Sequence, residues 1–410
     1  MSQRLIRFFA NLGLILGGLA VALVLLEIGL RFTSYRNLLL RDRHIRYYYQ
    51  FDAVKGFDIR PNVAKIRTSV DNHSVEYDIW SNELGCFDEP YRGEKDVILL
   101  VGDSFTHSYA PFEAKWGTCI EKLLNYRVLK GGVSGYGTKQ ELLKAQDLIA
   151  QIHRSPRLII VGYFMNDLDD DNSFPSLTVV DGFLVVCDQK YRDPKTGHLN
   201  LAVLEKHYTL WDKLTGNYPL TFWDLVTYYF DKHLILVNLI NDASIRLFPS
   251  KFFYTNPLNF TAFSQEPRVE NAWVKHKENL KAFKELAAAQ GAELLIVLIP
   301  TNTQVYPFLT GGRQIDLERP NRILGDFFRQ EQIRYLDLLP FFRMYADQTP
   351  RLYLSSDKDL YWRANSHFSL KGEHLTGLLV SRGILENNLV QVPDRDKKLK
   401  DIAEKLAQFR

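Results

Sequence analysis

Short apolar runs alternate with amphipathic segments along most of the chain after residue 95. Val97–Val101 and Leu294–Ile299 are rich in Val, Ile and Leu and stop at a glycine or a proline, which is typical of buried strands. Lys139–His153 and Val274–Ala289 instead place apolar residues at helical spacing. Strands that alternate with helices pair in parallel through right-handed crossovers, so this pattern predicts a doubly wound α/β sheet.

The elements of this sheet are expected in the following order. Strands are predicted at Val97–Val101, Tyr126–Leu129, Leu158–Val161, Leu294–Ile299 and Ile333–Leu338, and helices at Trp116–Leu124, Lys139–His153, Val274–Ala289 and Leu370–Ser381. We divide the chain into a membrane anchor helix at 1–34, a lead-in segment at 35–94 that packs on the main domain, the α/β domain at 95–393 and a charged, exposed C-terminal helix at 394–410.

A long apolar run opens the chain. Phe8–Leu26 contains 19 residues with Asn11 as the only polar side chain, and at about 1.5 Å per residue it nearly spans a hydrocarbon core of roughly 30 Å. A cleaved signal peptide is the alternative, with Ala20-Val21-Ala22 as the cleavage site, but the run exceeds the usual apolar region of about 7 to 15 residues. The run therefore predicts a membrane helix, with Glu27 and Arg31 paired one turn apart at its end.

An insertion at about 172–268 interrupts the alternation of strands and helices. Asp181-Gly182 lies between two β-branched runs and predicts a hairpin, and Leu220–Leu247 has a long helical pattern rich in aromatic residues. Three roles remain open for this insertion, which are to cover a site, to lie against the bilayer, or to enlarge the core.

Composition and charge limit the kinds of molecule that this protein is expected to bind. The chain has 410 residues, of which 46% are hydrophobic, and its formal charge is +3. Residues 1–46 carry a local charge of +5, so the remainder carries −2, and this argues against a nucleic-acid partner. The three cysteines are widely spaced without a metal-binding pattern, so no metal and no cofactor is expected. The sequence leaves any protein partner unidentified.

Polar residues follow the predicted strands where a doubly wound sheet binds its ligands. Ser104 follows the first strand, Gly135 the second and Asn166 the third, and His367 precedes the last long helix. A histidine can take the proton of a serine hydroxyl, and the N–H groups of Ser104 and Gly135 with the Asn166 amide can stabilise an oxyanion. The pattern therefore predicts acyl-transfer chemistry.

Each of these residues also has a structural explanation. Ser104 can cap the following helix, and Gly135 can serve a plain turn. Asn166 and the acidic residues after it can form a solvated loop, and His367 can be an ordinary surface histidine. The acidic residues do not match a calcium loop, and the glycines of 131–137 do not match a phosphate loop. The joint placement of the four segments favours the chemical interpretation.

At these residues the chain resembles the SGNH (GDSL-type) hydrolases. The segments "GDSF", "GGVSGYGTKQEL", "GYFMND" and "SHFSLKGEHL" look like the four blocks of that family in order, and the resemblance extends roughly from Asp96 to Ile384. The segments "LLEIGLR", "SNELGCFDEP" and "IPTNTQVYP" resemble a membrane-anchored bacterial subgroup. The resemblance implies a flavodoxin-like sheet, with Ser104 as nucleophile, Gly135 and Asn166 with the Ser104 N–H as oxyanion hole, and His367 as base.

One position departs from the family. An Asp usually stands two or three residues before the histidine, where this chain has Asn365 or Ala364. An asparagine carbonyl can still accept the Nδ1–H bond but carries no charge, so we assign Asn365 as the partner of His367. Asp357 and Asp359 are alternative partners by their place in the sequence.

These observations predict a serine esterase that acts on ester-linked acyl groups, with O-acetyl groups of extracytoplasmic glycans as the first substrate class suggested by the family. An acyltransferase to a sugar hydroxyl and a catalytically impaired, membrane-tethered binding or scaffold protein are the alternatives. The resemblance places the domain on the periplasmic side of a bacterial inner membrane. The arginines that flank the apolar run, two before and five after it, favour the cytoplasmic side.

Overall fold

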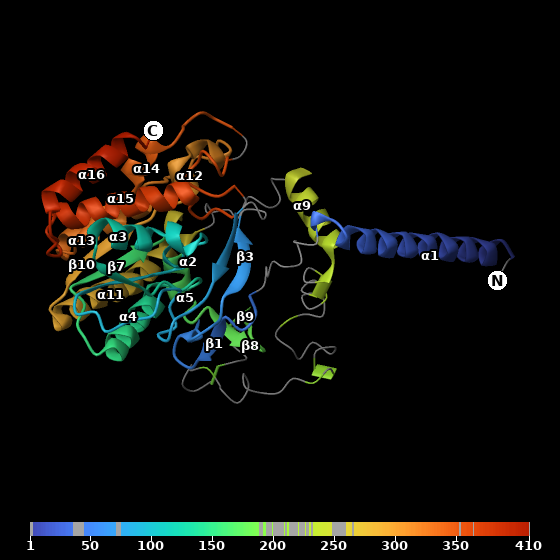
Figure 1. Ribbon diagram of the computed structural model, residues 1–410, viewed down its shortest axis with the longest axis horizontal. Coiled ribbons are helices and arrows are strands. Elements are labelled where there is room, and N and C mark those ends of the chain that lie inside the picture. Colours follow the sequence, from blue (N-terminus) through green and yellow to red (C-terminus); the bar gives the residue numbers. More distant parts are fainter. Residues whose placement is uncertain are drawn as a thin grey trace.

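The computed structural model describes most of the chain. It covers residues 3–35, 45–70, 75–187, 233–247, 260–264, 266–351, 354–363 and 365–409, with isolated positions between 192 and 230. Figure 1 shows a body of helices and strands from which one long N-terminal helix projects.

A five-stranded parallel sheet forms the centre of the body. Its strands are β5 (Val97–Gly102), β6 (Arg127–Lys130), β7 (Leu158–Tyr163), β10 (Glu293–Leu298) and β11 (Tyr335–Asp337). The spatial order is β11-β10-β7-β5-β6, so the first strand of the sheet lies between the second and the third, as in flavodoxin-like folds. The predicted doubly wound α/β sheet is confirmed.

Helices cover both faces of this sheet. The six residues of β5 are all buried, and Ile98 and Leu100 pack on one face while Leu99 and Val101 pack on the other. The first face carries α3 (Trp116–Leu124), α15 (Leu370–Glu386) and α16 (Arg395–Ala407), and the second carries α4 (Thr138–Ile152), α11 (Pro267–Gln290) and α13 (Arg319–Gln330). The predicted helices are therefore present, with α11 and α15 longer than expected.

The C-terminal helix α16 is exposed on one face only. Ile402 and Leu406 lie one turn apart and are buried in the core beside α15. The expectation of an exposed helix is therefore wrong for these two residues. The segment was expected to be exposed because it is rich in charged residues, and its two apolar residues at helical spacing were given no weight.

Among the residues that the structure describes, three small antiparallel hairpins lie outside the central sheet. Two of them, which the sequence analysis did not predict, are formed by β1 (Tyr49–Asp52) with β2 (Gly56–Ile59) and by β3 (Ile66–Val70) with β4 (Val75–Ile79). The third joins β8 (Leu177–Val180) to β9 (Phe183–Val186) and confirms the hairpin expected at Asp181-Gly182, where both residues have positive φ.

Aromatic and ionic contacts join the lead-in segment to the α/β body. Phe57 packs edge-on against Tyr136 with ring centroids 5.1 Å apart, and Tyr136 donates a hydrogen bond to the Phe57 carbonyl at 2.6 Å. The buried Lys144 of α4 forms a 2.8 Å ion pair with Asp58. These contacts place the β1–β2 hairpin over the loop that follows β6.

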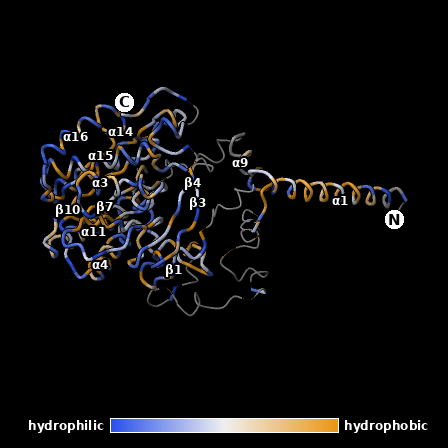
Figure 2. The backbone as a smooth tube through the Cα atoms, viewed as in Figure 1, coloured by the Kyte–Doolittle hydropathy of each residue, from blue (hydrophilic) through white to orange (hydrophobic). Residues whose placement is uncertain are grey.

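Helix α1 (Gln3–Arg31) extends away from the body (Figure 1). Its segment Arg7–Arg31 is long and apolar enough to cross a membrane, a property that a signal sequence shares. Figure 2 shows that hydrophobic residues predominate along this helix. The predicted ion pair of Glu27 with Arg31 is present at 3.2 Å.

The end of the long helix expected at Leu220–Leu247 is present as α9 (Ile235–Leu247), and most of residues 220–232 lie outside the described part of the chain. Short helices complete the structure at α2 (Ser104–His107), η2 (Phe112–Ala114), α5 (Asp167–Asn172), η5 (Thr261–Phe263), α12 (Asn302–Val305), η6 (Pro307–Thr310) and α14 (Leu339–Tyr345).

Candidate active site

Ser104 lies at the carboxyl edge of the sheet, directly after β5. Asp103 caps the short helix α2, because its Oδ1 accepts the Phe105 N–H at 2.9 Å, and Ser104 is the first helical residue. The strand passes close to β7 at Gly102, where a Cβ would lie 2.8 Å from the Gly162 carbonyl oxygen. Glycine is thus required at position 102, and the cap is Asp103 and not Ser104.

His367 reaches the same edge from the loop before α15. Its Nε2 lies 2.8 Å from the Ser104 Oγ, although 263 positions separate the two residues. The loop is fixed from both sides, since the Trp362 N–H donates to the His367 carbonyl at 2.8 Å and Ser369 caps α15. The structure therefore brings together the serine and the histidine expected from the sequence.

Asn365 determines which nitrogen of the His367 ring carries the proton. The ring Nδ1 lies 2.8 Å from the Asn365 carbonyl oxygen and 3.2 Å from its Oδ1. A backbone carbonyl only accepts hydrogen bonds, so Nδ1 carries the hydrogen and the Nε2 lone pair faces the serine hydroxyl. The Asn365 Oδ1 also accepts the His367 backbone N–H at 3.0 Å.

The other proposed partners of the histidine do not take this position. Asp359 is buried, forms an ion pair with Arg351 and accepts the Ser355 N–H at 2.6 Å. Because Nδ1 donates to Asn365, neither Asp359 nor Asp357 replaces the missing carboxylate. Ala364 lies outside the described residues.

Two aromatic rings enclose the imidazole. The centroids of Phe105 and Tyr109 lie 4.7 and 4.5 Å from that of His367, and the ring is only partly exposed. This burial lowers the pKa of His367 to about 4, against which the bond to Asn365 acts weakly. The imidazole is therefore neutral at pH 7 and able to accept a proton. The sequence analysis missed Tyr109, although it lies only five residues after the serine.

The loop of Gly135 adjoins this ring through Tyr109. The Tyr109 hydroxyl bonds the Ser134 Oγ at 2.7 Å, and Gly135 has a φ of +86°, which only glycine adopts without strain. This loop lies after β6 at the same edge of the sheet. The turn at Gly135 therefore adjoins the Tyr109 ring that contacts the imidazole, and the role of Gly135 in binding an oxyanion is a proposal.

Asn166 follows β7 and immediately precedes α5. Its Nδ2 donates to Asp170 at 2.9 Å, and its Oδ1 is buried with no partner among the described residues. The amide retains a second N–H, which is the one available to an oxyanion. The acidic residues after Asn166 are not the solvated loop given as an alternative, because Asp167 and Asp171 are buried and the Asp171 Oδ2 bonds the His276 Nδ1 at 2.7 Å.

Four carboxyl groups lie close enough to interact electrostatically, and two of them contact Ser104 and Asn166. We call them the acid cluster: the buried Asp103, Glu141 and Asp167 and the partly buried Asp170. Burial raises the pKa of Asp103 to about 7. Burial and the charge of Asp103 together raise the pKa of Asp170 to about 7. Burial also raises the pKa of Glu141 and Asp167, and neither carboxylate oxygen of Glu141 has a hydrogen-bond partner among the described residues. The Asp103 Oδ2 lies 3.2 Å from the Ser104 Oγ, so it is an alternative acceptor to the His367 Nε2 for the single hydrogen of the Ser104 hydroxyl.

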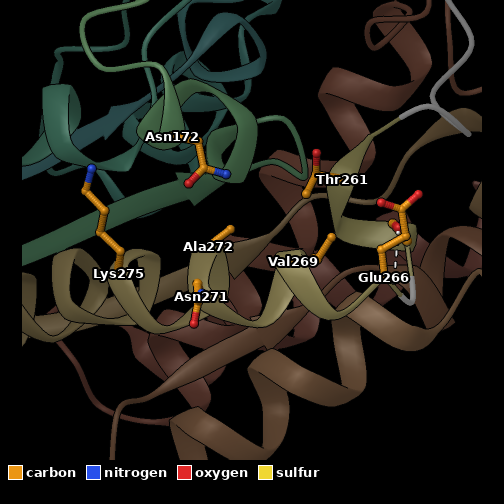
Figure 3. Close-up of a pocket in the computed structure, with 8 residues that line it drawn as sticks. Asn172, Thr261, Glu266, Val269, Asn271, Ala272 and Lys275 are labelled. Atoms are coloured by element: carbon orange, nitrogen blue, oxygen red, sulfur yellow. Dashed lines mark hydrogen bonds between the residues drawn. The ribbon is translucent and has the colours of Figure 1, made fainter.

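Within the described part of the chain, the His, Cys, Asp and Glu side chains form no group arranged to hold a metal ion. A cavity of about 590 Å³ lies between the end of α5, η5 and the first turns of α11 (Figure 3). It is lined by Asn172, Thr261, Ser264, Glu266, Val269, Asn271, Ala272 and Lys275. This cavity is distinct from the site of Ser104 and His367, neither of which lines it.

Comparison with known proteins gives matches only among solved structures. No family model and no curated protein matches this sequence. Many of the similar structures are GDSL or SGNH lipolytic hydrolases. A member of the lipolytic G-D-S-L family from Veillonella parvula is 13% identical, with a TM-score of 0.33, and the match covers 68% of this chain and 93% of that one.

Two further structures match at the same level. The protein in the structure of TesA has 15% sequence identity to this chain. The match covers 72% of this chain and 100% of that one, with a TM-score of 0.35. The acetyl xylan esterase AlAXEase is 11% identical over 70% of this chain and 99% of its own, also with a TM-score of 0.35.

Proposed function

We propose that this chain is a membrane-anchored serine esterase that cleaves ester-linked acyl groups through an acyl-enzyme on Ser104. The observation that carries the proposal is the 2.8 Å contact between the Ser104 Oγ and the His367 Nε2, with the proton of the imidazole held on Nδ1 by the Asn365 carbonyl. A hydroxyl beside the lone pair of a neutral imidazole is the arrangement that nucleophilic catalysis needs.

The reaction has two steps. In the first, the Ser104 oxygen bonds to the ester carbonyl carbon while its proton moves to the His367 Nε2. The N–H groups of Ser104 and Gly135 and the Asn166 amide stabilise the oxyanion, each donor contributing about 10²–10³ in rate. The intermediate collapses, the C–O bond to the alcohol breaks, and His367 returns the proton to the leaving oxygen. In the second step, water attacks the acyl-enzyme by the same route and releases the acid.

Asn365 sets the strength of the base. In a serine protease, Asp-to-Asn replacement costs about 10⁴ in rate, mainly because the imidazole adopts the wrong tautomer. In this chain the backbone carbonyl of Asn365 fixes the tautomer independently of the side chain. What the site lacks is a negative charge beside the imidazolium, so the proposed enzyme retains the geometry but has a weak base.

Labelling with a fluorophosphonate tests the proposal. We expect the purified full-length chain to become covalently modified at Ser104, and Ser104→Ala to abolish the modification with an unchanged circular dichroism spectrum. Ser173→Ala, which removes an exposed hydroxyl, is the matched control and retains labelling. A folded wild-type chain that takes no label would instead support the membrane-tethered binding or scaffold protein.

The acceptor of the acyl group is tested separately. We propose water as the acceptor and O-acetyl esters of extracytoplasmic glycans as the substrate class, on the family resemblance of the sequence. Turnover of p-nitrophenyl acetate with added oligosaccharide should then yield acetate without acetylated sugar. Acetylated sugar as the main product would favour the acyltransferase.

We further propose that the α/β domain lies on the periplasmic side of the inner membrane. An alkaline phosphatase fused to the C-terminus is then expected to be active in intact bacteria. A fusion that is stable yet inactive would place the domain in the cytoplasm, as the arginine distribution suggests.

A further inference from the structure

The end of the apolar N-terminal helix is bonded to the insertion. Glu27 is the first charged residue after the run Phe8–Leu26, and its carboxylate accepts the N–H groups of Ile235 at 3.1 Å and Leu236 at 2.9 Å. Arg31, one turn later, donates from Nη2 to the His233 carbonyl at 2.8 Å. These bonds make Glu27 a buried residue on a helix that is otherwise almost wholly exposed.

The contact holds the first turn of α9 beside Glu27, near the C-terminal end of α1. The first N–H groups of a helix have no partner within it, and a carboxylate satisfies them and favours the positive end of the helix dipole. In α9 that carboxylate comes from a residue more than 200 positions away, at the point where the apolar run ends. Figure 1 shows α9 lying across the direction of α1 and not along it.

Large apolar side chains are exposed around this junction. Phe32 is 87% exposed and Tyr35 50%, both just after α1, while Tyr229 and Phe230 precede α9 and are about half exposed. Ile240, in the second turn of α9, is 55% exposed. Tyrosine side chains gather at the level of lipid headgroups in membrane proteins, and phenylalanine is typical of the apolar face of helices that lie in that layer. An arginine at the end of a span also favours that level.

We propose that α9 and the aromatic residues next to it lie in the interfacial layer of the bilayer that α1 crosses. The molecule that contacts this surface is phospholipid, because the C-terminal end of α1 is hydrogen-bonded to the N-terminal end of α9 at the level where the apolar run stops. A helix that lies in the interface is a second membrane contact beside the span. Two contacts restrict rotation about the axis of α1, so the domain that carries Ser104 has a fixed orientation toward the membrane.

Depth measurement on the full-length chain in phosphatidylcholine–phosphatidylglycerol nanodiscs tests the proposal. A spin label is placed at Ile240→Cys or, as control, at Met344→Cys on α14, in a Cys119→Ser, Cys187→Ser background that leaves only the buried Cys86. The two positions are matched, since both native side chains are 55% exposed. We expect the ratio of oxygen to nickel-chelate accessibility to be at least about threefold higher at 240 than at 344. Equal ratios would overturn the proposal, as would an intact mass showing that α1 is removed.

A second variant tests the bond between the two helices. Glu27→Ala leaves the apolar run intact but removes both acceptors from the N-terminus of α9. We expect the accessibility ratio at 240 to fall toward that at 344, and an unchanged ratio would show that Glu27 does not hold α9 in place. Hydrolysis of soluble p-nitrophenyl acetate is measured in parallel, because its loss would concern the chemistry at Ser104 and not the position of α9.

Discussion

At the scale of single residues, Asn365 distinguishes this site from a Ser-His-Asp arrangement. It supplies two acceptors to the imidazole Nδ1 and a third bond to the His367 backbone N–H, so the ring is positioned without a carboxylate. Enclosure by Phe105 and Tyr109 leaves the ring with a pKa of about 4. The site therefore combines a correctly oriented imidazole with little stabilisation of its protonated form.

Introducing the missing charge should strengthen the base. In Asn365→Asp, a carboxylate beside Nδ1 favours the imidazolium and raises the pKa of His367 above about 4. We expect the acidic limb of kcat/KM to move to higher pH and the plateau near pH 8 to rise by about tenfold, a small part of the ~10⁴ lost in the reverse change in a protease. The measurement is a pH profile with p-nitrophenyl acetate from pH 3.5 to 9.

The control for this change is Asn365→Ala, which keeps the backbone carbonyl but removes Oδ1. It should lower the plateau without moving the acidic limb to higher pH. If Asn365→Asp gives the same profile as the wild type, His367 does not act as the base.

The sequence predicted the residues of this site better than their surroundings. Ser104, His367 and Asn365 were identified because they lie in short motifs next to strand or helix ends. The contact of Tyr109 with the imidazole and the engagement of Asp359 with Arg351 depend on how loops fold over one another. Contacts between loops leave no periodic pattern in the sequence, so they could not be predicted from it.

At the scale of elements, β5, β7 and β10 were predictable because each is almost wholly buried and contains a continuous apolar run. The hairpins of the lead-in segment were not, since β1 and β3 are short, only partly buried and rich in polar residues. Helix α16 was predicted, but its packing was not. Its two buried apolar residues lie among many charges and bind it to the core beside α15.

Truncating one of these residues should destabilise the α/β body. Leu406→Ala removes a side chain that is 4% exposed, and such changes cost roughly 2–5 kcal/mol when the cavity does not collapse. Because α16 is terminal, we expect the free energy of unfolding to fall by an amount near the lower end of this range, about 2 kcal/mol. Urea unfolding measures this change, and its midpoint should move to a lower urea concentration. Lys397→Ala on the exposed face of the same helix is the control and should change stability by less than about 0.5 kcal/mol. Equal effects of the two substitutions would show that α16 does not pack on α15 in solution.

At the scale of the whole molecule, the acid cluster couples folding to pH. These carboxyl groups lie where the Ser104 loop, α4 and α5 meet. Burial raises the folded pKa of each, and repulsion from neighbouring carboxylates raises the pKa values of Glu141, Asp167 and Asp170 further. A carboxyl with a raised folded pKa contributes stability that is complete below its unfolded pKa of about 4 and is lost as pH rises through its folded pKa. The buried His107 and the partly buried His367 act in the opposite sense, because their lowered pKa values remove stability as pH falls below about 6.5.

Glu141→Gln isolates the contribution of the cluster. The amide has nearly the shape of the buried acid but cannot ionise, so the variant should not lose the stability that the wild type loses as Glu141 ionises. Because burial raises the folded pKa of Glu141 well above its usual value, we expect the free energy of unfolding at pH 8, relative to that at pH 5, to be higher in the variant than in the wild type. Urea unfolding at both pH values measures it, with unchanged m-values required for the comparison.

The matched control is Glu278→Gln, which makes the same chemical change on the exposed side of α11. It should leave the pH dependence as it is in the wild type. If Glu141→Gln also leaves it unchanged, Glu141 is ionised in the folded protein at neutral pH. The acid cluster would then hold a buried negative charge near Asp103, the residue that contacts the Ser104 hydroxyl, and that charge would oppose the developing oxyanion and so slow the proposed reaction.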